Sequence, residues 1–197
     1  MSGCLHKLSR RGPSLEVIGI TGRKRHGKDT VARELALHGF TVVRFADPLK
    51  AMLRAFYAAH GLSDFEIEMK IEGALKEAPC TFLNGRTPRY AMQTLGTEWG
   101  RDLIDINLWT DSLQRRAAAH DKVVVPDVRF SNECDAVSAI GGKMLRVEAR
   151  QRVGITEQSN HSSETGIDVL PVDLEISNNG TLFELSAAVR AALGFST

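Results

Sequence analysis

The sequence has little of what would place it in a specialised class of protein. Its three cysteines, Cys4, Cys80 and Cys134, lie too far apart for a zinc site or a disulfide framework, so we expect reduced thiols. No apolar run approaches the roughly 20 residues that a membrane helix requires. The net charge is only +1, from 25 basic and 24 acidic residues, which argues against a surface that coats nucleic acid. We therefore expect a cytoplasmic protein with no membrane and no nucleic-acid partner.

What is present is typical of one globular domain. Hydrophobic residues make up 43% and charged residues 25% of the 197 residues, which suits a single α/β domain with a small insertion. The N-terminal segment contains Lys7, Arg10 and Arg11, but no apolar stretch of signal-peptide type follows them. We expect residues 1–14 to form a flexible tail and residues 15–197 to form the domain.

Along this domain, segments in which apolar residues recur with the period of a strand alternate with segments in which they recur with the period of a helix. This alternation indicates a βαβ fold. The expected strands cover residues 15–21, 41–45, 122–125, 143–148 and 173–177. The expected helices cover residues 28–37, 48–60, 88–103, 108–120, 132–140 and 181–193. The pattern predicts the α/β class, with a five-stranded parallel sheet that helices cover on both faces. Two polar segments interrupt the alternation, a helical insertion over about residues 61–105 and a loop over about residues 150–166.

The most specific motif is the run Gly22-Arg-Lys-Arg-His-Gly27-Lys28-Asp29-Thr30, which follows a predicted strand and opens a predicted helix. Glycines let backbone N–H groups turn inward, and the helix N-terminus adds partial positive charge around a polyphosphate. Lys28 can bridge the β- and γ-phosphates of ATP, so we predict that it is catalytic. The alternative is a glycine turn before a basic helix. The ATP-binding residues predicted in this loop are Gly22, Arg25, Gly27, Lys28, Asp29 and Thr30.

Magnesium is expected beside this loop. The residue after the lysine is Asp29 instead of the usual serine or threonine, and the hydroxyl comes one position later, at Thr30. The apolar strand Lys122-Val-Val-Val ends in Pro126-Asp127, as a Walker B element does. Because proline cannot donate to a central ladder, the strand must end there, which leaves Asp127 at the edge where ligands of α/β sheets bind. Thr30 and Asp127 are the predicted metal ligands, and a plain turn aspartate is the alternative.

Five segments, taken in their order along the chain, resemble the bacteriophage deoxynucleoside monophosphate kinases. They are Gly27-Lys-Asp-Thr30, Phe45-Ala-Asp-Pro-Leu-Lys50, Gln93-Thr-Leu-Gly-Thr-Glu-Trp-Gly-Arg101, Pro126-Asp-Val-Arg-Phe130 and His161-Ser-Ser-Glu164. Only the first is specific by itself, and the joint order of all five makes the resemblance strong. The resemblance implies a P-loop kinase fold with an acceptor-binding helical insertion and a lid, ATP and Mg²⁺ as the donor, and a deoxynucleoside 5′-monophosphate as the acceptor. It also implies a homodimer and, for a viral protein, the host cytoplasm.

The helix over residues 88–103 is the expected acceptor-binding element. At about 100° per residue, an apolar stripe forms on one side, which we expect in the core. On the neighbouring polar face, a guanidinium and an amide can bind a phosphate and a base edge, although such residues also serve solubility alone. The stripe is Met92, Leu95, Trp99 and Leu103, and the predicted acceptor ligands are Arg89, Gln93 and Thr97.

Further acceptor contacts are predicted for Lys24, Asp47, Lys50 and Arg129. The basic triplet Arg23-Lys-Arg25 suits a site where two phosphates approach each other, because they repel without cations between them, and a solvated basic turn is the alternative. Asp47 is explained equally well as a helix cap. Arg129 emerges at the same sheet edge as Asp127, so we predict that it is catalytic, with a surface salt bridge as the alternative.

The polar loop over residues 150–166 is the expected lid. Arg150 and Arg152 open it, and arginines of such loops neutralise the transferring phosphoryl group, so both are predicted to bind ATP and Arg150 to be catalytic. Asn178, in a turn after the last strand, is a predicted adenine contact, with a plain turn residue as the alternative. No role follows for His161–Glu164. Two rival functions remain open, a kinase of another small phosphate such as phosphomevalonate or dephospho-coenzyme A, and a P-loop NTPase that acts as a switch or assembly protein.

Overall fold

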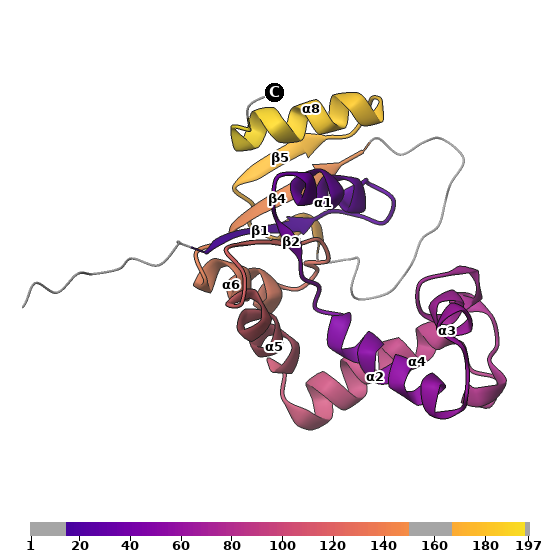
Figure 1. Ribbon diagram of the computed structural model, residues 1–197. Coiled ribbons are helices and arrows are strands. Elements are labelled where there is room, and N and C mark those ends of the chain that lie inside the picture. The colour runs from indigo at the N-terminus through magenta and orange to yellow at the C-terminus, as the bar shows by residue number, and fades with distance from the viewer. Residues whose placement is uncertain (1–14, 150–166, 196–197) are drawn as a thin grey trace, which may run out of the picture.

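The computed structural model describes residues 15–149 and 167–195, which form a five-stranded sheet with helices on both faces (Figure 1). The strand order is β2-β3-β1-β4-β5, and all four neighbouring pairs are parallel. This confirms the predicted fold class. The predicted tail over residues 1–14 and the predicted lid over residues 150–166 lie outside the described residues. The strands are β1 (Glu16–Thr21), β2 (Thr41–Val42), β3 (Lys122–Val125), β4 (Lys143–Glu148) and β5 (Leu174–Ser177).

Seven α-helices, three 3₁₀ segments and one π-helix surround the sheet within the described ranges. The α-helices are α1 (Lys28–Leu37), α2 (Asp47–Ala59), α3 (Asp64–Ile71), α4 (Pro88–Thr94), α5 (Leu108–Ala117), α6 (Ser131–Ala139) and α8 (Leu182–Leu193). The 3₁₀ segments are η1 (Ala74–Glu77), η2 (Thr81–Leu83) and η4 (Ile167–Val169), and η3 (Leu95–Ile104) is a π-helix. None of the helices in this part of the chain has the length and apolar character needed to cross a bilayer.

The two faces of the sheet are buried by different helices. Successive side chains of a strand point to opposite faces, so Ile18 and Ile20 of β1 pack with α1 and α8, whereas Val17 packs with α5 and α6. Figure 1 shows α1 and α8 on one side of the sheet and α5 and α6 on the other. β3 ends at Val125, as Pro126 predicts. β2 is shorter than predicted, because the Asp47 carboxylate accepts the Arg44 N–H at 2.8 Å and turns the chain toward α2.

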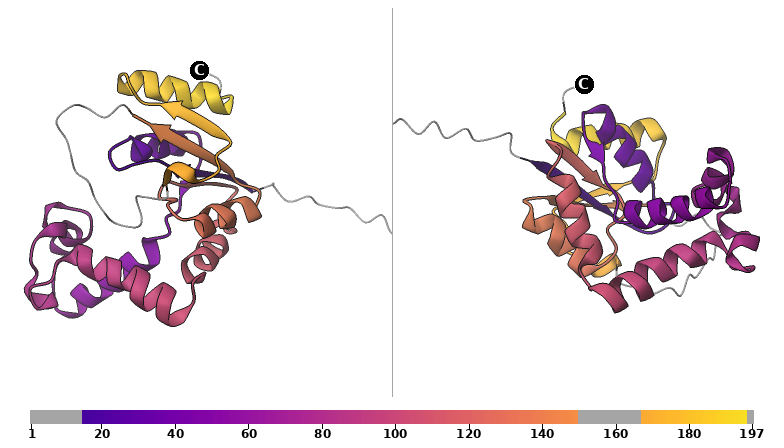
Figure 2. Two further views of the ribbon diagram at one scale, coloured as in Figure 1. Left: turned by 180° about the vertical axis from the view of Figure 1, so that it is seen from behind. Right: turned by 60° about the horizontal axis from the view of Figure 1, so that its bottom comes forward.

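The segment from α2 to α4 forms a helical region that projects beyond the sheet (Figure 2). Two of its helices start where a hydroxyl caps them: the Ser63 hydroxyl accepts from Glu66 N at α3, and the Thr87 hydroxyl accepts from Tyr90 N at α4. Tyr57 of α2 and Ile71 of α3 are fully buried in the same apolar cluster as the α5–α6 face. The helical region is therefore packed onto the domain as an extension of its core.

The expected apolar stripe of the acceptor helix is wrong in its second half. Met92 is buried and Leu95 is partly buried, but Trp99 is 38% exposed and Leu103 is 76% exposed. The prediction assumed an α-helix to residue 103, whereas the chain changes to a π-helix at Leu95, and its wider turn rotates the later side chains away from the core. The buried positions of this π-helix are Gly96 and Gly100.

These two glycines give a matched pair for testing the packing of η3. A Cβ at Gly100 would lie 2.5 Å from the Trp109 indole, whereas a Cβ at Gly96 would meet only a Leu49 methyl at 3.5 Å. We expect Gly100→Ala to lower the free energy of unfolding by about 1–3 kcal/mol more than Gly96→Ala does, because overpacking forces neighbouring groups to shift. Urea unfolding of both variants measures the difference. Equal free energies would show that Trp109 does not pack on Gly100.

Candidate phosphate-transfer site

The loop between β1 and α1 has the backbone of a phosphate-binding loop. Gly22 has φ 138° and Gly27 has φ 99°, conformations that glycine adopts without strain. A Cβ at Gly22 would lie 2.4 Å from the Val147 carbonyl oxygen, so only glycine fits there. Arg25, the third variable position of the loop, also has a positive φ of 66°. The helix α1 begins at Lys28, so its first N–H groups and the positive end of its dipole border the loop.

Lys28 lies against the loop that it is predicted to serve. Its Nζ donates to the carbonyl oxygens of Gly22 at 2.7 Å and Arg23 at 2.8 Å. The ammonium is therefore held at the mouth of the loop, where it can meet a polyphosphate without moving far. This position fits the predicted phosphate role of Lys28.

The loop is braced by two other elements. The Asn178 side-chain amide, just after β5, donates to the His26 carbonyl at 3.0 Å. Nδ1 of His26 lies 3.2 Å from the Val147 carbonyl oxygen and 3.3 Å from the Ala149 N–H at the end of β4. The amide of Asn178 thus has a structural partner in the loop, and its contact with adenine stays a prediction.

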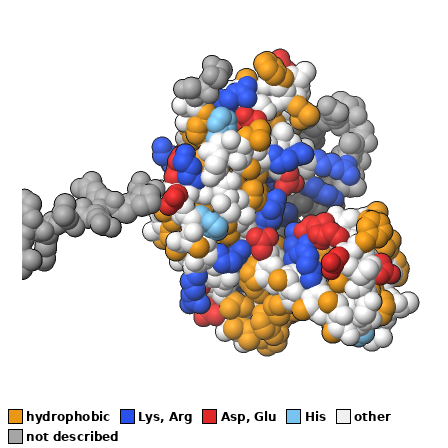
Figure 3. Space-filling view, in the orientation of Figure 1, with side chains coloured by type: hydrophobic (Ala, Val, Ile, Leu, Met, Phe, Trp, Pro, Cys, Tyr) orange, Lys and Arg blue, Asp and Glu red, His pale blue; other side chains and the backbone are white. Residues whose placement is uncertain are grey.

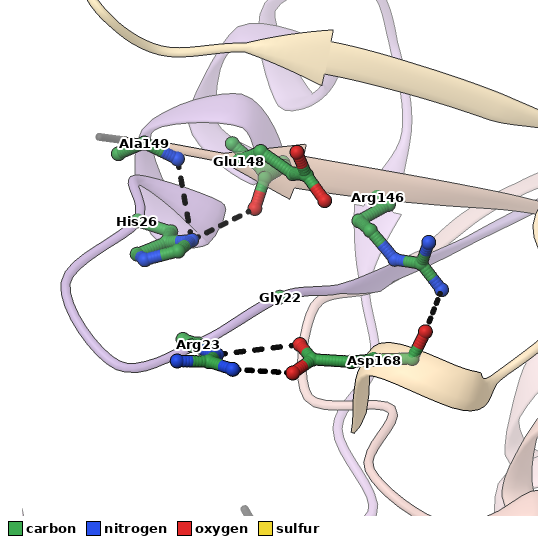
Figure 4. A pocket seen from close by; sticks show the side chains of 8 residues that line it. Gly22, Arg23, His26, Arg146, Glu148, Ala149 and Asp168 are labelled. Carbon is green, nitrogen blue, oxygen red and sulfur yellow. Dashed lines mark hydrogen bonds and ion pairs between the residues drawn. The ribbon is translucent and has the colours of Figure 1, made fainter. Parts of the chain in front are cut away.

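A cavity of about 260 Å³ opens beside the loop, between β1, β4 and η4 (Figure 4). Arg23 of the loop forms an ion pair with Asp168 of η4 there, and Arg146 of β4 donates to the Asp168 carbonyl at 3.2 Å. Figure 4 shows Arg23 and Arg146 reaching Asp168 from opposite directions. The Arg23 guanidinium holds the pKa of the Asp168 carboxyl below its ordinary range. Sequence reasoning missed Asp168, because nothing in its local motif points to the loop.

Asp127 follows β3 and stands beside the start of the P-loop. The next residue, Val128, donates its N–H to the Ile20 carbonyl at 3.2 Å, near the end of β1. An Asp127 oxygen accepts from Phe45 N at 3.3 Å. Burial raises the pKa of the Asp127 carboxyl, although the backbone N–H groups of Phe45 and Ala46 and the charge of Arg129 act in the opposite direction. This position fits the predicted Walker B role of Asp127, which stays a prediction.

The residues present fit a magnesium ion whose coordination would be completed by phosphate and water oxygens. Thr30 lies in the first turn of α1 and offers a hydroxyl, and Asp127 offers a carboxylate beside the same loop. Mg²⁺ prefers such oxygen ligands and commonly keeps several waters. Asp29 is exposed and lies 3.6 Å from the Arg44 guanidinium. Within residues 15–149 and 167–195 no group of three or more His, Cys, Asp or Glu side chains could hold a metal unaided.

Glu133 is a buried carboxylate that sequence reasoning missed. It is the third residue of α6, and one of its oxygens accepts from Arg129 N at 2.8 Å and Phe130 N at 3.2 Å. Its other oxygen accepts from Arg101 at 2.8 Å. Burial and the nearby Asp127 charge raise the pKa of the Glu133 carboxyl to about 7, from an ordinary value of 4.5. In sequence it looks like an ordinary capping glutamate, and its burial is the result of tertiary packing.

This pKa predicts how stability depends on pH in the ligand-free protein. Between pH 4.5 and about 7 the folded state holds a proton on Glu133 that the unfolded state has released. Stability should therefore fall as the pH rises through this window, by about 3 kcal/mol in total from this group. We expect Glu133→Gln to remove that slope, while Glu148→Gln, at an exposed position, keeps it. Urea unfolding across pH 4–8 measures the slopes, and parallel curves for wild type and Glu133→Gln would contradict the prediction.

The predicted acceptor cations of the helical region are each held by a glutamate. Lys50 of α2 pairs with Glu72 at 2.7 Å, and Arg89 of α4 pairs with Glu77. A further lysine, Lys76 of η1, lies 3.9 Å from Glu72. Partial burial and the charges of Lys50 and Arg89 lower the pKa of Lys76. The three cations thus share one small region, and Lys76 was not predicted.

The other acceptor candidates are less closely grouped. Asp47 accepts from Arg44 N and forms an ion pair with Arg116 at 3.2 Å, which supports the capping alternative. Gln93 and Thr97 are exposed on α4 and η3. Arg129 is partly buried near Asp127. Figure 3 shows Lys and Arg side chains gathered along the hollow between the sheet and the helical region. Lys24 is exposed in the P-loop, and Arg150 and Arg152 lie outside the described residues.

Comparisons with known proteins show the family of the chain. The family model for deoxynucleotide monophosphate kinases matches residues 82–189, more than half of the chain. A protein of Acanthamoeba polyphaga mimivirus that provisionally carries this kinase name is 32% identical over 189 residues, covering 88% of this chain and 93% of its own length. The deoxynucleotide monophosphate kinase of Enterobacteria phage T4 is 24% identical over 243 residues, covering 91% of this chain and 99% of its own.

Among solved structures, TT1252 from Thermus thermophilus superposes with a TM-score of 0.51 at 19% sequence identity, covering 93% of this chain and 98% of that one. This likeness concerns the fold alone. The family match over residues 82–189 and the mimivirus relative, at 32% identity over 88% of this chain, go further than the fold. The chain is a kinase and belongs to the deoxynucleotide monophosphate kinase family.

Proposed function

We propose that this kinase transfers the γ-phosphoryl group of ATP·Mg²⁺ to a deoxynucleoside 5′-monophosphate, releasing ADP and the deoxynucleoside diphosphate. The observation that supports this best is a second group of cations apart from the P-loop. Lys50, Lys76 and Arg89 come together on α2, η1 and α4, in the helical region that continues from the end of β2. An NTPase that transfers phosphate to water has no need of such a group. A kinase needs it to hold a second anion.

Transfer requires that two anions be held in line and that their charge be neutralised. Backbone N–H groups of the P-loop and Lys28 hold the donor phosphates. Arg129, beside Asp127, neutralises charge on the group in transit. Thr30 and Asp127 would hold Mg²⁺, which when bound would neutralise further charge on the donor phosphates. The acceptor phosphate displaces the glutamates from Lys50 and Arg89, and no covalent intermediate on the protein is needed.

A coupled assay of ADP release tests the proposal. Purified protein is incubated with ATP, Mg²⁺ and one acceptor at a time, drawn from the deoxy- and ribonucleoside monophosphates, phosphomevalonate and dephospho-coenzyme A. We expect ADP release that depends on a deoxynucleoside monophosphate. Release that is independent of any acceptor would identify a slow NTPase, and dependence on one of the other phosphates would identify a different kinase.

Arg89 provides a specific test of the acceptor region. We expect Arg89→Ala to raise KM for the monophosphate by about 10–100-fold, because a charge-assisted pair with phosphate is worth about 1.5–3 kcal/mol, while KM for ATP stays unchanged. Arg86→Ala is the matched control, since Arg86 is an exposed arginine of the same segment that stacks on Tyr90. Steady-state kinetics in both substrates measure the effect. An equal rise for both substrates would move the acceptor phosphate away from Arg89.

We also propose that the enzyme works as a cytoplasmic homodimer. The support is the resemblance to the phage kinases and a run of exposed apolar side chains, Leu103, Ile104 and Ile106, at 54–76% exposure. Sedimentation equilibrium at micromolar concentration should give twice the monomer mass of 21.6 kDa. A monomer at that concentration would refute the dimer without affecting the proposed reaction.

A further inference from the structure

Arg101 of η3 is a partly buried arginine that the proposed reaction does not use. Its side chain is 17% exposed, and it donates to the Glu133 carboxylate at 2.8 Å. Its guanidinium carbon lies 4.5 Å from the centre of the Phe130 ring, and its second terminal nitrogen lies 3.4 Å from the Gly96 carbonyl oxygen. A surface arginine kept for solubility would not be fixed from three directions.

These contacts connect two parts of the candidate site. Gly96 lies between Gln93 and Thr97, the predicted acceptor ligands, and its carbonyl also accepts from the Trp109 indole at 2.8 Å. Glu133, on the other side, accepts the backbone N–H groups of Arg129 and Phe130, so it fixes the loop that follows Asp127. Arg101 therefore joins the acceptor helix to this loop.

The π-helical turn supports a functional reason for this arrangement. Gly96 and Arg101 both lie in the π-helix η3, and π-helical segments occur frequently at functional sites. The planar guanidinium meets the carboxylate, the carbonyl and the aromatic face at once, which an ammonium cannot do. The network therefore depends on arginine at this position.

We propose that Arg101 is a positioning residue for phosphoryl transfer. Through its ion pair with Glu133, it holds the acceptor-binding turn at Gly96 in a fixed position relative to the Asp127–Arg129 loop. The inference rests on the proposed function. Its physical basis is that a displacement of about 1 Å between reacting groups can cost about 100-fold in rate. Arg101 contacts the turn at Gly96 directly, whereas it reaches the Asp127–Arg129 loop only through Glu133, which keeps its bonds to the backbone N–H groups of Arg129 and Phe130. Its loss should therefore affect the acceptor side of the reaction far more than the binding of ATP.

Two variants test this. Arg101→Met keeps a long side chain and removes its charge and hydrogen-bond donors. Arg101→Lys keeps the charge but lacks the planar guanidinium. We expect Arg101→Met to lower kcat/KM for the monophosphate by about 100-fold, while KM for ATP stays within about 2-fold of wild type. Arg101→Lys should recover part of the loss. Unchanged acceptor kinetics, or equal losses for ATP and the monophosphate, would overturn the proposal.

A double variant separates positioning from stability. Arg101→Met leaves the Glu133 charge buried without its arginine, which can unfold the protein. In Arg101→Met/Glu133→Gln that charge is absent, so we expect the melting temperature to recover while kcat/KM for the monophosphate stays about 100-fold low. Acceptor kinetics that recover together with stability would show a purely structural role and overturn the inference. Wild type without acceptor-dependent ADP release would instead refute the proposed function, so the two failures are distinguishable.

Discussion

Lys28→Ala is expected to lower turnover by about 1000-fold without unfolding the protein. The lysine ammonium donates to two carbonyl oxygens of its own loop, and the loss of such bonds costs about 1 kcal/mol of stability. In the reaction it neutralises charge on the donor phosphates, and comparable charged groups in phosphoryl transfer are worth about 10³-fold or more. The result would show that the ammonium acts on the transferring group and does not serve the fold.

Lys143→Ala is the matched control for this substitution. Lys143 is an exposed lysine at the start of β4, the end of the sheet opposite to the P-loop, so its loss should change neither turnover nor stability. The coupled ADP-release assay and thermal unfolding are measured on both variants. A folded Lys28→Ala enzyme with near-normal turnover would remove Lys28 from the catalytic residues.

The P-loop could be predicted from sequence because its determinants are local. Gly22, Gly27 and Lys28 lie within one turn between a strand and a helix, and the positive φ values of both glycines confirm why they are required. The strand Lys122–Val125 and its end at Pro126 are local features as well. The α/β class could be predicted in the same way, because the spacing of apolar residues along each element indicates which of its faces is buried.

The rest of the site depends on contacts between distant segments. The pairs Lys50–Glu72 and Arg101–Glu133 join residues far apart in the chain, and no local pattern encodes them. The exposure of Trp99 and Leu103 was predicted wrongly for a related reason. A 100° periodicity assumes an α-helix, whereas the packing of Gly100 against Trp109 accompanies a π-helical turn.

Asp127→Asn is expected to change activity and stability in opposite directions. The aspartate is a predicted magnesium ligand, and an amide is a poorer ligand for a hard cation, so kcat should fall by about 100-fold or more and the Mg²⁺ concentration for half-maximal rate should rise. In the ligand-free protein, burial raises the pKa of the Asp127 carboxyl, which means that the fold disfavours its charge. An asparagine of the same shape carries no charge and can still accept from Phe45 N, so the variant should unfold at a higher temperature than wild type.

The pH dependence of this rise in melting temperature tests whether the charge of Asp127 is its cause. Because the folded-state pKa is raised, the charge of Asp127 destabilises the protein above the ordinary pKa of 3.8, and the penalty disappears as the pH falls toward that value. The gain in melting temperature should therefore be largest near pH 8 and should shrink toward pH 4. Asp135→Asn, at an exposed position of α6, is the control and should change neither quantity. A less stable Asp127→Asn protein would mean that the carboxylate is kept for its hydrogen bonds, and full activity would mean that magnesium is held elsewhere.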